Sequence, residues 1–275
     1  MPVVSIIIPV YNAEKYLKTS LESIQMQSFK SFEVLMIDDG SKDGSIDILR
    51  SFAEADERFS FVSVKNGGPS KARNIGLSKA SGQYIQFMDS DDTLDENFLE
   101  KMIHAIEHKD IAICGYNMVC KDQVTKKTSL PGTYSLEVYL KSFSTYYMDL
   151  QFQFVWNKLY RRDTISNHNL HFDESTKRGE DILFNLEYFR RVQRIEILDE
   201  PLYQYFNCIS SSLTNTYNPR LFEDQQRIFN AIRIFLEEQN LYAKNAAMIE
   251  TMYIDRVIGC FRNLFLPDCP LPYKE

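Results

Sequence analysis

The chain has 275 residues, of which 44% are hydrophobic and 25% are charged, and its formal net charge is −7. This length allows one large domain, or one domain with a smaller appendage, around a sizeable core. The 19 phenylalanines and 16 tyrosines exclude a disordered chain, which lacks such packing side chains. The negative charge argues against general nucleic-acid binding, which needs a dense Lys and Arg surface. The negative charge is still compatible with a small phosphate ligand that is held by a few basic residues and a metal.

Neither a membrane span nor a secretory signal is expected. No run approaches the roughly 20 apolar residues that cross a bilayer. The apolar stretch at residues 3–10 is short and has no basic segment before it. The five cysteines are dispersed and form no Cys-x-x-Cys pair, so we expect reduced thiols, as in cytosolic proteins. The sequence predicts a soluble, cytoplasmic protein that can touch the inner face of the membrane.

Over the first 120 residues, short apolar runs alternate with helical patterns. We expect strands at residues 3–10, 32–37, 59–64, 84–88 and 111–116. Helices are expected between them, one N-capped by Ser70 and running to about Ala80, and one capped by Asp95. This alternation predicts an α/β fold with a mostly parallel, Rossmann-like sheet flanked by helices.

The rest of the chain is less regular and ends in helices. A polar stretch at residues 121–129 predicts a loop or a hairpin, and residues 195–198 predict a strand. Helical patterns cover residues 136–147, 180–191, 221–239 and 243–265. Pro219 favours a helix start at the first of the two C-terminal helices.

Two acidic clusters follow predicted strands. Asp38 and Asp39 come after the second strand, and Asp89, Asp91 and Asp92 come after the fourth. Ligands of open α/β sheets bind beyond the carboxyl ends of the strands, and clustered carboxylates need a cation or hydrogen-bond donors. Asp89-x-Asp91 suits a hard cation such as Mg²⁺ or Mn²⁺ that also binds phosphate oxygens. The alternative is that these residues only cap the following helices.

A glycine-containing loop at residues 66–70 precedes a predicted helix. Gly68 permits close backbone approach, the helix N-terminus favours anions, and Arg73 can bridge phosphate oxygens. Beside the acidic clusters, this loop suggests a metal-bound diphosphate. The first strand is not followed by Gly-x-Gly-x-x-Gly, which argues against a nicotinamide site. Tyr11 could instead pack beside a nucleobase, or simply pack at the start of a helix.

Together these segments resemble glycosyltransferase family 2, whose members have the GT-A fold and use nucleotide-sugar donors. The matching segments are residues 5–12 (SIIIPVYN), 32–41 (FEVLMIDDGS), 72–76 (ARNIG), 87–92 (FMDSDD), 156–160 (WNKLY) and 179–184 (GEDILF). Their order and spacing match the family closely over residues 1–120, whereas residues 216–275 carry no family motif. The resemblance implies a nucleotide-sugar-binding half at residues 1–120, an acceptor-side half at 121–215 and a helical C-terminal extension at 216–275.

The resemblance also implies roles for individual residues. Asp181 would be the catalytic base, with Glu180 orienting it or the acceptor. Asp91, with Asp89, would bind the divalent metal. The nucleotide-sugar pocket would be lined by Pro9, Tyr11, Asn12, Asp38, Asp39, Gly68, Arg73, Asp89 and Ser90. Within it, Asp39 would accept a hydrogen bond from the base, Arg73 would lie near the base or the diphosphate, and Asp89 near the ribose or the sugar. Trp156 and Lys158 would border the sugar and the acceptor.

Two of these assignments can also be explained by purely structural roles. Glu180 and Asp181 open a predicted helix, where acidic side chains interact favourably with the helix dipole. Trp156 is the only tryptophan, and it could be a core side chain as readily as a platform for a sugar ring.

By resemblance, the chain is an inverting, metal-dependent glycosyltransferase that uses Mn²⁺ or Mg²⁺ and a UDP-sugar. Its acceptor would be a hydroxyl of a saccharide, a glycolipid or a glycoprotein, as in polysaccharide biosynthesis or protein glycosylation. One alternative is a catalytically inactive glycosyltransferase-like binding module. A nucleotidyltransferase would need a Gly-rich basic loop after the first strand, which residues 9–12 do not provide.

The C-terminal stretch at residues 252–265 mixes apolar side chains with Arg256 and Arg262. It could lie on an anionic membrane surface, pair with another subunit in a homo-oligomer, or cover the catalytic domain.

Overall fold

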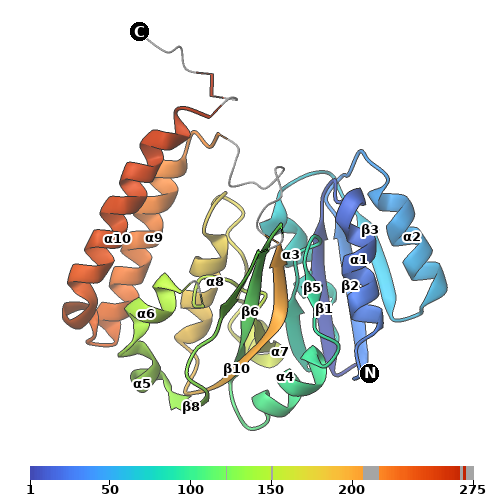
Figure 1. Ribbon diagram of the computed structural model, residues 1–275, viewed down its shortest axis with the longest axis horizontal. Coiled ribbons are helices and arrows are strands. Elements are labelled where there is room, and N and C mark those ends of the chain that lie inside the picture. The colour runs from blue at the N-terminus through green and yellow to red at the C-terminus, as the bar shows by residue number, and fades with distance from the viewer. Residues whose placement is uncertain (122, 150, 207–216, 267–268, 271–275) are drawn as a thin grey trace.

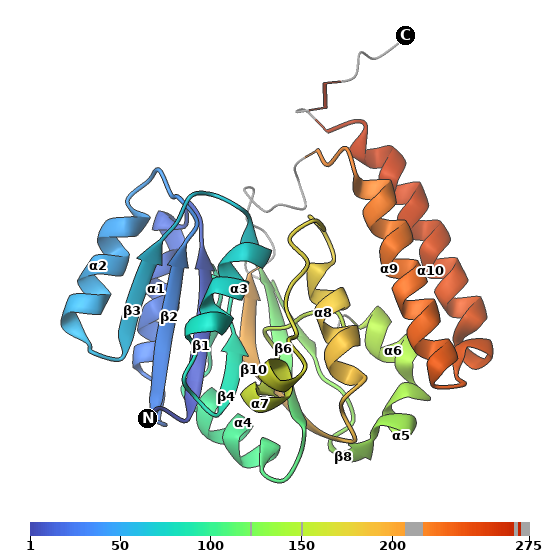
Figure 2. The ribbon, with the colours of Figure 1, turned by 180° about the vertical axis from the view of Figure 1, so that it is seen from behind.

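The structure is a computed structural model that describes residues 1–121, 123–149, 151–206, 217–266 and 269–270. A central mixed sheet carries helices on both faces, and two long antiparallel helices stand beside it (Figure 1). Helices α1 and α4 cover one face of the sheet, and α3, α7 and α8 cover the other (Figure 2). The predicted α/β fold is confirmed.

The N-terminal half forms a parallel sheet in the order β3-β2-β1-β4. Its strands are β1 (Val4–Val10), β2 (Phe32–Asp38), β3 (Phe59–Ser63) and β4 (Tyr84–Phe87). Its helices are α1 (Glu14–Gln25), α2 (Ser45–Ala55), α3 (Pro69–Lys79) and α4 (Phe98–Ile106). Pro9, which has no N–H to donate, lies in β1 beyond the last residue that pairs with β4.

The second half makes the sheet mixed. Strand β9 (Lys158–Arg161), which we did not predict, inserts antiparallel between β4 and β6 (Ile111–Cys120). Strand β10 (Arg194–Phe206) is far longer than the expected strand at 195–198, and it pairs parallel to β6 and antiparallel to the short β5 (Thr93–Leu94). Both halves therefore contribute strands to one sheet.

Several smaller elements refine the prediction. The polar stretch at 121–129 forms a hairpin, because β7 (Gln123–Lys127) folds back on β6. Strand β8 (Gly132–Ser135) and helix α7 (Arg162–Asn167) were not predicted. The expected helix at 136–147 is two short helices, α5 (Leu136–Leu140) and α6 (Phe143–Met148). Helix α8 spans Glu180–Phe189.

The predicted caps were wrong in detail. Helix α3 begins at Pro69 directly after Gly68, which adopts a φ of 90°, so Ser70 lies inside the helix and does not cap it. Helix α4 begins one residue after Asn97, and the carboxylate of Asp95 accepts from the Asn97 N–H in the preceding turn.

The C-terminal helices α9 (Leu221–Glu238) and α10 (Tyr242–Asn263) form an antiparallel hairpin. Helix α9 packs against the start of α8. A Cβ added to Gly179 would come within 2.2 Å of Ile228 Cδ1, so only glycine permits this approach, and its φ of 92° also favours glycine.

The described part of the chain contains no helix long and apolar enough to cross a bilayer. Cys114, Cys260 and Cys269 are free thiols, as expected. Cys120 is disulfide-bonded, which contradicts the expectation of reduced thiols for that residue.

Candidate active site

The guanidinium of Arg73 joins three carboxylates from three segments of the chain. Its Nη2 donates to Asp89 Oδ1 at 2.9 Å, and its Nη1 donates to Glu180 Oε1 and Asp181 Oδ1 at 3.1 Å each. Arg73 lies on the second turn of α3, Asp89 follows β4, and Glu180 and Asp181 open α8. The structure thus brings together four residues that the sequence predicted for the site.

Arg73 is buried, with only 4% of its surface exposed. Its guanidinium lies 5.3 Å from the centre of the Phe172 ring, which stacks in turn on Phe184. Asn74 exchanges two hydrogen bonds with the backbone of Phe172, which anchors that ring beneath the guanidinium. The Arg73 guanidinium therefore packs against the stacked aromatic rings of Phe172 and Phe184.

The site carries more negative charge than its arginine balances. Burial raises the pKa of Asp181 to about 8, helped by Glu180 and Asp89 and opposed by Arg73 and Lys158. Burial and the neighbouring Asp89 raise the pKa of Asp91 to about 6. The carboxylates in turn outweigh burial and raise the pKa of Arg73. Such shifts show that the site would gain stability from a further cation or a proton.

Asp92 lies beneath this group of acids and is fully buried. It accepts hydrogen bonds from the Tyr203 hydroxyl at 2.8 Å and from the Phe206 N–H at 2.9 Å. The Tyr203 hydroxyl also accepts from the Asp89 N–H at 3.2 Å. Burial, Asp89 and Asp91 raise the pKa of Asp92 well above its usual range. Strand β10 therefore fixes the turn that carries Asp89 and Asp91.

The first acidic cluster is arranged differently. Asp39 accepts the N–H groups of Gly67 at 2.7 Å and of Gly68 at 2.8 Å, one on each carboxylate oxygen. Asp39 thus takes up the two glycine amides in the loop that was predicted to lie near a metal-bound diphosphate. Each carboxylate oxygen keeps a second lone pair, so Asp39 can still accept another hydrogen bond.

Asp38, which was predicted to line the nucleotide-sugar pocket, lies in the protein interior. It is fully buried, and its Oδ1 accepts from the Ser41 N–H at 3.0 Å. Its Oδ2 has no partner among the described residues. Asp38 shapes the turn after β2.

The loop after β1 lies against the loop after β2. The Asn12 N–H donates to Ser41 Oγ, and Asn12 Oδ1 accepts from the Lys42 N–H, with Asn12 at a φ of 49°. Tyr11 is 49% exposed beside this contact, and Pro9 and Ser90 are half-buried. Tyr11 and Asn12 are therefore accessible from solvent.

The structure buries Trp156 and Lys158, which were predicted to border the sugar and the acceptor. Trp156 is 1% exposed and stacks on Tyr203 at 4.2 Å and on Phe154 at 4.5 Å. Lys158 is fully buried and donates to the carbonyls of Gln151 and Phe154. Burial lowers the pKa of Lys158 to about 7, opposed by Asp181. Both residues are therefore interior side chains that pack next to the site.

Sequence reasoning missed Tyr203, Tyr205 and Phe172. Tyr203 and Tyr205 lie two residues apart on β10, and both stack on Trp156. Burial and the acids Asp92, Asp89 and Asp91 raise the pKa of Tyr205 to about 12. The alternation of residues 202–206 could have extended the predicted strand, but nothing local indicated its proximity to the acidic cluster.

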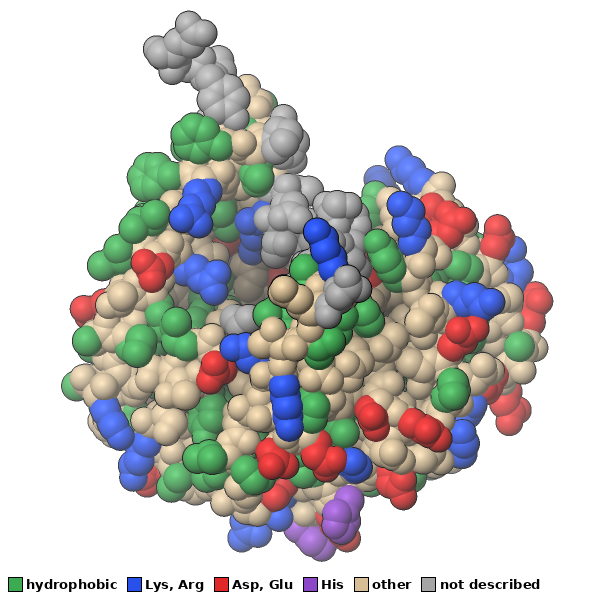
Figure 3. Space-filling model, in the orientation of Figure 1, with side chains coloured by type: hydrophobic (Ala, Val, Ile, Leu, Met, Phe, Trp, Pro, Cys, Tyr) green, Lys and Arg blue, Asp and Glu red, His purple; other side chains and the backbone are tan. Residues whose placement is uncertain are grey.

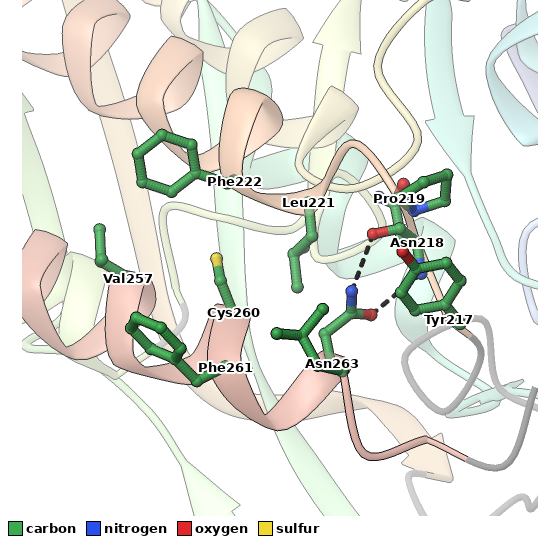
Figure 4. A pocket seen from close by; sticks show the side chains of 10 residues that line it. Tyr217, Asn218, Pro219, Leu221, Phe222, Val257, Cys260, Phe261 and Asn263 are labelled. Carbon is green, nitrogen blue, oxygen red and sulfur yellow. Dashed lines mark hydrogen bonds between the residues drawn. The ribbon is translucent and has the colours of Figure 1, made fainter. Parts of the chain in front are cut away.

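A cavity of about 240 Å³ lies elsewhere, between the ends of α9 and α10. Its lining is mostly apolar, and Asn218 and Asn263 exchange two hydrogen bonds at one end (Figure 4). It contains no acidic or basic side chain, so it does not suit a charged sugar donor.

The described residues contain no cluster of three or more His, Cys, Asp or Glu side chains arranged to hold a metal. A metal at Asp91 would therefore need ligands from elsewhere, such as phosphate oxygens or water.

Comparison with known proteins decides the family. The model of the family described as Glycosyl transferase family 2 matches residues 5–168. The uncharacterized glycosyltransferase EpsJ of Bacillus subtilis strain 168 is 32% identical over 248 residues, which are 88% of this chain and 72% of EpsJ. The chain belongs to glycosyltransferase family 2. It is accordingly a glycosyltransferase enzyme.

Relatives of known structure support the same fold. TarS of Staphylococcus aureus strain MW2, a poly(ribitol-phosphate) beta-N-acetylglucosaminyltransferase, is 30% identical over 209 residues, which are 73% of this chain and 35% of TarS. The crystal structure of S. aureus TarS residues 1–349 in complex with UDP-GlcNAc superposes with a TM-score of 0.73 at 24% identity, covering 94% of this chain and 73% of that one. The predicted GT-A fold is thereby confirmed.

Proposed function

We propose that this glycosyltransferase moves a sugar from a UDP-sugar to an acceptor hydroxyl with inversion, at the site around Arg73. The observation that carries the proposal is the meeting of Asp89, Glu180 and Asp181 on one buried guanidinium, beside an Asp91 carboxyl whose pKa is raised to about 6. Asp89 and Asp91 come from the sheet edge, and Glu180 and Asp181 come from the opposite half of the chain.

The UDP-sugar assignment draws on TarS, whose crystal structure holds UDP-GlcNAc. A mannosyltransferase from Pyrobaculum calidifontis, captured with GDP-Man and Mn²⁺, shares the fold at a TM-score of 0.62 and 13% identity. The fold alone thus accommodates either nucleotide. The accessible Tyr11 and Asn12, together with Asp39 and Pro9, would surround the base, and Asp89 and Ser90 would lie near the ribose and sugar.

The residues present fit a divalent metal. Asp91 offers a hard oxygen ligand, and its raised pKa shows that its charge is poorly compensated. Asp91, with Asp89, would hold Mn²⁺ or Mg²⁺ together with diphosphate oxygens. When bound, the metal would offset the negative charge of the leaving diphosphate.

Asp181 is the base in this proposal. The acceptor oxygen attacks the anomeric carbon, the bond from that carbon to the diphosphate oxygen breaks, and the hydroxyl proton passes to Asp181. In its ionised form, a carboxylate with a pKa of about 8 is a stronger base than an ordinary aspartate. Attack opposite the leaving group inverts the anomeric configuration. Arg73 holds Asp181 and Glu180 in place before the acceptor arrives.

In this scheme residues 1–120 bind the donor, residues 121–215 face the acceptor and residues 216–275 form a helical extension. The acceptor would be a hydroxyl of a saccharide, a glycolipid or a glycoprotein. TarS is named for poly(ribitol-phosphate), a polymer that also carries hydroxyl groups.

A donor screen tests the proposal. Purified protein is incubated with Mn²⁺ and either UDP- or GDP-sugars, and nucleoside diphosphate release is measured with wild type and Asp91→Ala. We expect release from a UDP-sugar that Asp91→Ala abolishes. Donor binding without release from any nucleotide-sugar, even with saccharide acceptors added, would instead indicate an inactive binding module. Release that Asp91→Ala leaves unchanged would reject the assigned metal ligand.

A further inference from the structure

The segment that leads into helix α8 has no regular structure of its own. Residues 168–179 lie between α7 and α8 and form neither a helix nor a strand. They end directly before Glu180 and Asp181, the two acids that Arg73 holds in the site. Because no helix or sheet ladder fixes this segment, its position depends on side-chain contacts with the elements around it.

On one side the segment is held by α3. Asn74, the neighbour of Arg73, exchanges two hydrogen bonds with the backbone of Phe172. Asn74 Nδ2 also donates to Glu174 Oε1 at 3.0 Å. The segment is therefore tied to the helix that carries the guanidinium of the site.

On the other side the segment is held by Arg227 of α9. Asp173 closes a turn there, since its Oδ1 accepts from the N–H of Ser175 at 2.8 Å and from its Oγ at 2.6 Å. Arg227 Nη1 donates to Ser175 Oγ at 2.9 Å and to Thr176 Oγ1 at 3.2 Å. Arg227 Nη2 pairs with Asp173 Oδ2. One guanidinium thus contacts three side chains of this turn, which its planar fork of donors permits.

Helix α9 also contacts both ends of α8. Ile228, the neighbour of Arg227, fills the space beside Gly179, directly before α8. At the other end, Arg190 donates to Glu238 Oε2 at 2.8 Å, and its guanidinium lies 5.6 Å from the centre of the Phe235 ring. Helix α9 accordingly lies between α8 and α10 in both ribbon views (Figure 1, Figure 2). The exposed hydrophobic side chains of the extension gather at its outer edge, over α10 and away from α8 (Figure 3).

We propose that Arg227 is a positioning residue for Asp181, so that the C-terminal extension orients the acids at the start of α8. The inference rests on the proposed function in one respect, which is the assignment of Asp181 as the base. It concerns residues beyond the family match, which ends at residue 168. A helix that only covered the core would use its apolar side, with Ile232 and Leu236, and would need no guanidinium on the turn at 173–176.

Amide hydrogen exchange of the full chain tests whether Arg227 holds the segment. In Arg227→Ala the amides of residues 173–183 should exchange faster by about tenfold, because local opening becomes easier once charged hydrogen bonds are lost. The variant should stay folded, since the Arg227 side chain is 51% exposed. Arg233→Ala is the matched control, because Arg233 lies on the same helix and pairs only with Glu237 within it. Its exchange at residues 173–183 should equal that of wild type.

Turnover with the most active UDP-sugar of the donor screen tests the effect on the reaction. Arg227→Ala should lower kcat by about tenfold and leave the donor KM near that of wild type, since a displacement of about 1 Å can cost about 10²-fold in rate. Arg227→Lys keeps the charge without the planar fork and should recover part of the rate. In an Asp181→Asn background, Arg227→Ala should cause little further loss, because it acts through Asp181.

Unchanged exchange at residues 173–183, or an unchanged kcat in Arg227→Ala, would overturn the inference. Equal losses in Arg227→Ala and Arg233→Ala would do the same, since they would show a general effect on α9. So would a loss of rate that persists in full in the Asp181→Asn background. A wild-type rate in Asp181→Asn would instead reject the proposed base, whereas the exchange measurement would still decide whether Arg227 holds the segment.

Discussion

The two acidic clusters follow β2 and β4, the strands on either side of β1, yet their surroundings differ. Asp39 accepts a backbone N–H on each of its oxygens, and Asp38 caps the turn after β2. Around Asp89, Asp91 and Asp181, a single guanidinium faces several carboxylates, and the pKa values of Asp91 and Asp181 are raised. Backbone amides satisfy Asp39, and Asp38 Oδ2 has no partner among the described residues. The raised pKa values of Asp91 and Asp181 distinguish the second cluster as the one that favours a cation.

The largest expected effect is on catalysis in the second cluster. Asp181→Asn should lower the rate of sugar transfer by about 10²–10⁴-fold, the usual contribution of a general base, while donor binding persists. Asp39→Asn, in the first cluster, keeps an oxygen acceptor for a glycine amide and should lower the rate far less. Transfer rates at saturating donor and donor affinities for both variants check this, and equal losses of rate would remove the distinction.

The next effect is on stability. Arg73→Met should lower the free energy of unfolding by about 3–5 kcal/mol at pH 8, because it leaves buried carboxylates without a partner. The deficit should shrink at pH 5, where Asp181 and Asp91 are protonated. Urea unfolding at both pH values measures it. Arg50→Met is the control, since Arg50 pairs with Asp47 at an exposed site and should lower stability by about 1 kcal/mol or less. A deficit for Arg73→Met that is the same at both pH values would argue against uncompensated charge.

A smaller loss is expected from the first cluster. Asp39→Ala removes the acceptors of the Gly67 and Gly68 amides and should lower the free energy of unfolding by about 1–3 kcal/mol. The same method measures it. Unchanged stability would mean that the loop before α3 is not held by Asp39.

The smallest effect has the opposite sign. The folded protein keeps Asp91 protonated up to about pH 6, whereas the unfolded chain releases that proton near pH 4. The free energy of unfolding contributed by this group is therefore fully present below about pH 4 and is lost as the pH rises through 6. Asp91→Asn should abolish this loss and raise stability at pH 8 by about 1 kcal/mol, while removing metal-dependent transfer. Urea midpoints at pH 4.5 and pH 8 compare the two proteins, and a variant less stable than wild type at pH 8 would contradict the account.

The sequence predicted the parallel half of the fold well because its signals are local. Apolar runs such as 3–10 and 32–37 match β1 and β2 to within a residue at each end. Strand β9 was missed, since Lys158–Arg161 has only four residues, carries a charge at each end and is stabilised by its neighbours β4 and β6. Short strands of this kind depend on tertiary pairing that local patterns do not carry.

The sequence predicted the acidic residues of the site, but it did not predict most of their hydrogen-bond partners. Asp89, Asp91, Glu180, Asp181 and Arg73 were found from motifs. That Gly67 and Gly68 donate to Asp39, and that Tyr203 donates to Asp92 from 111 positions away, depends on the folded chain. The burial of Trp156 among three stacked rings, and of Lys158 among three oxygen acceptors, likewise depends on tertiary contacts.

The most direct test of the central claim is thermal unfolding with UDP and Mn²⁺. A ligand that binds only the folded state raises its stability by mass action. We predict that Mn²⁺ with UDP raises the unfolding temperature of wild type, and that Asp91→Asn shows little or no rise. An equal rise in Asp91→Asn would contradict the assignment of the second acidic cluster as the cation and donor site.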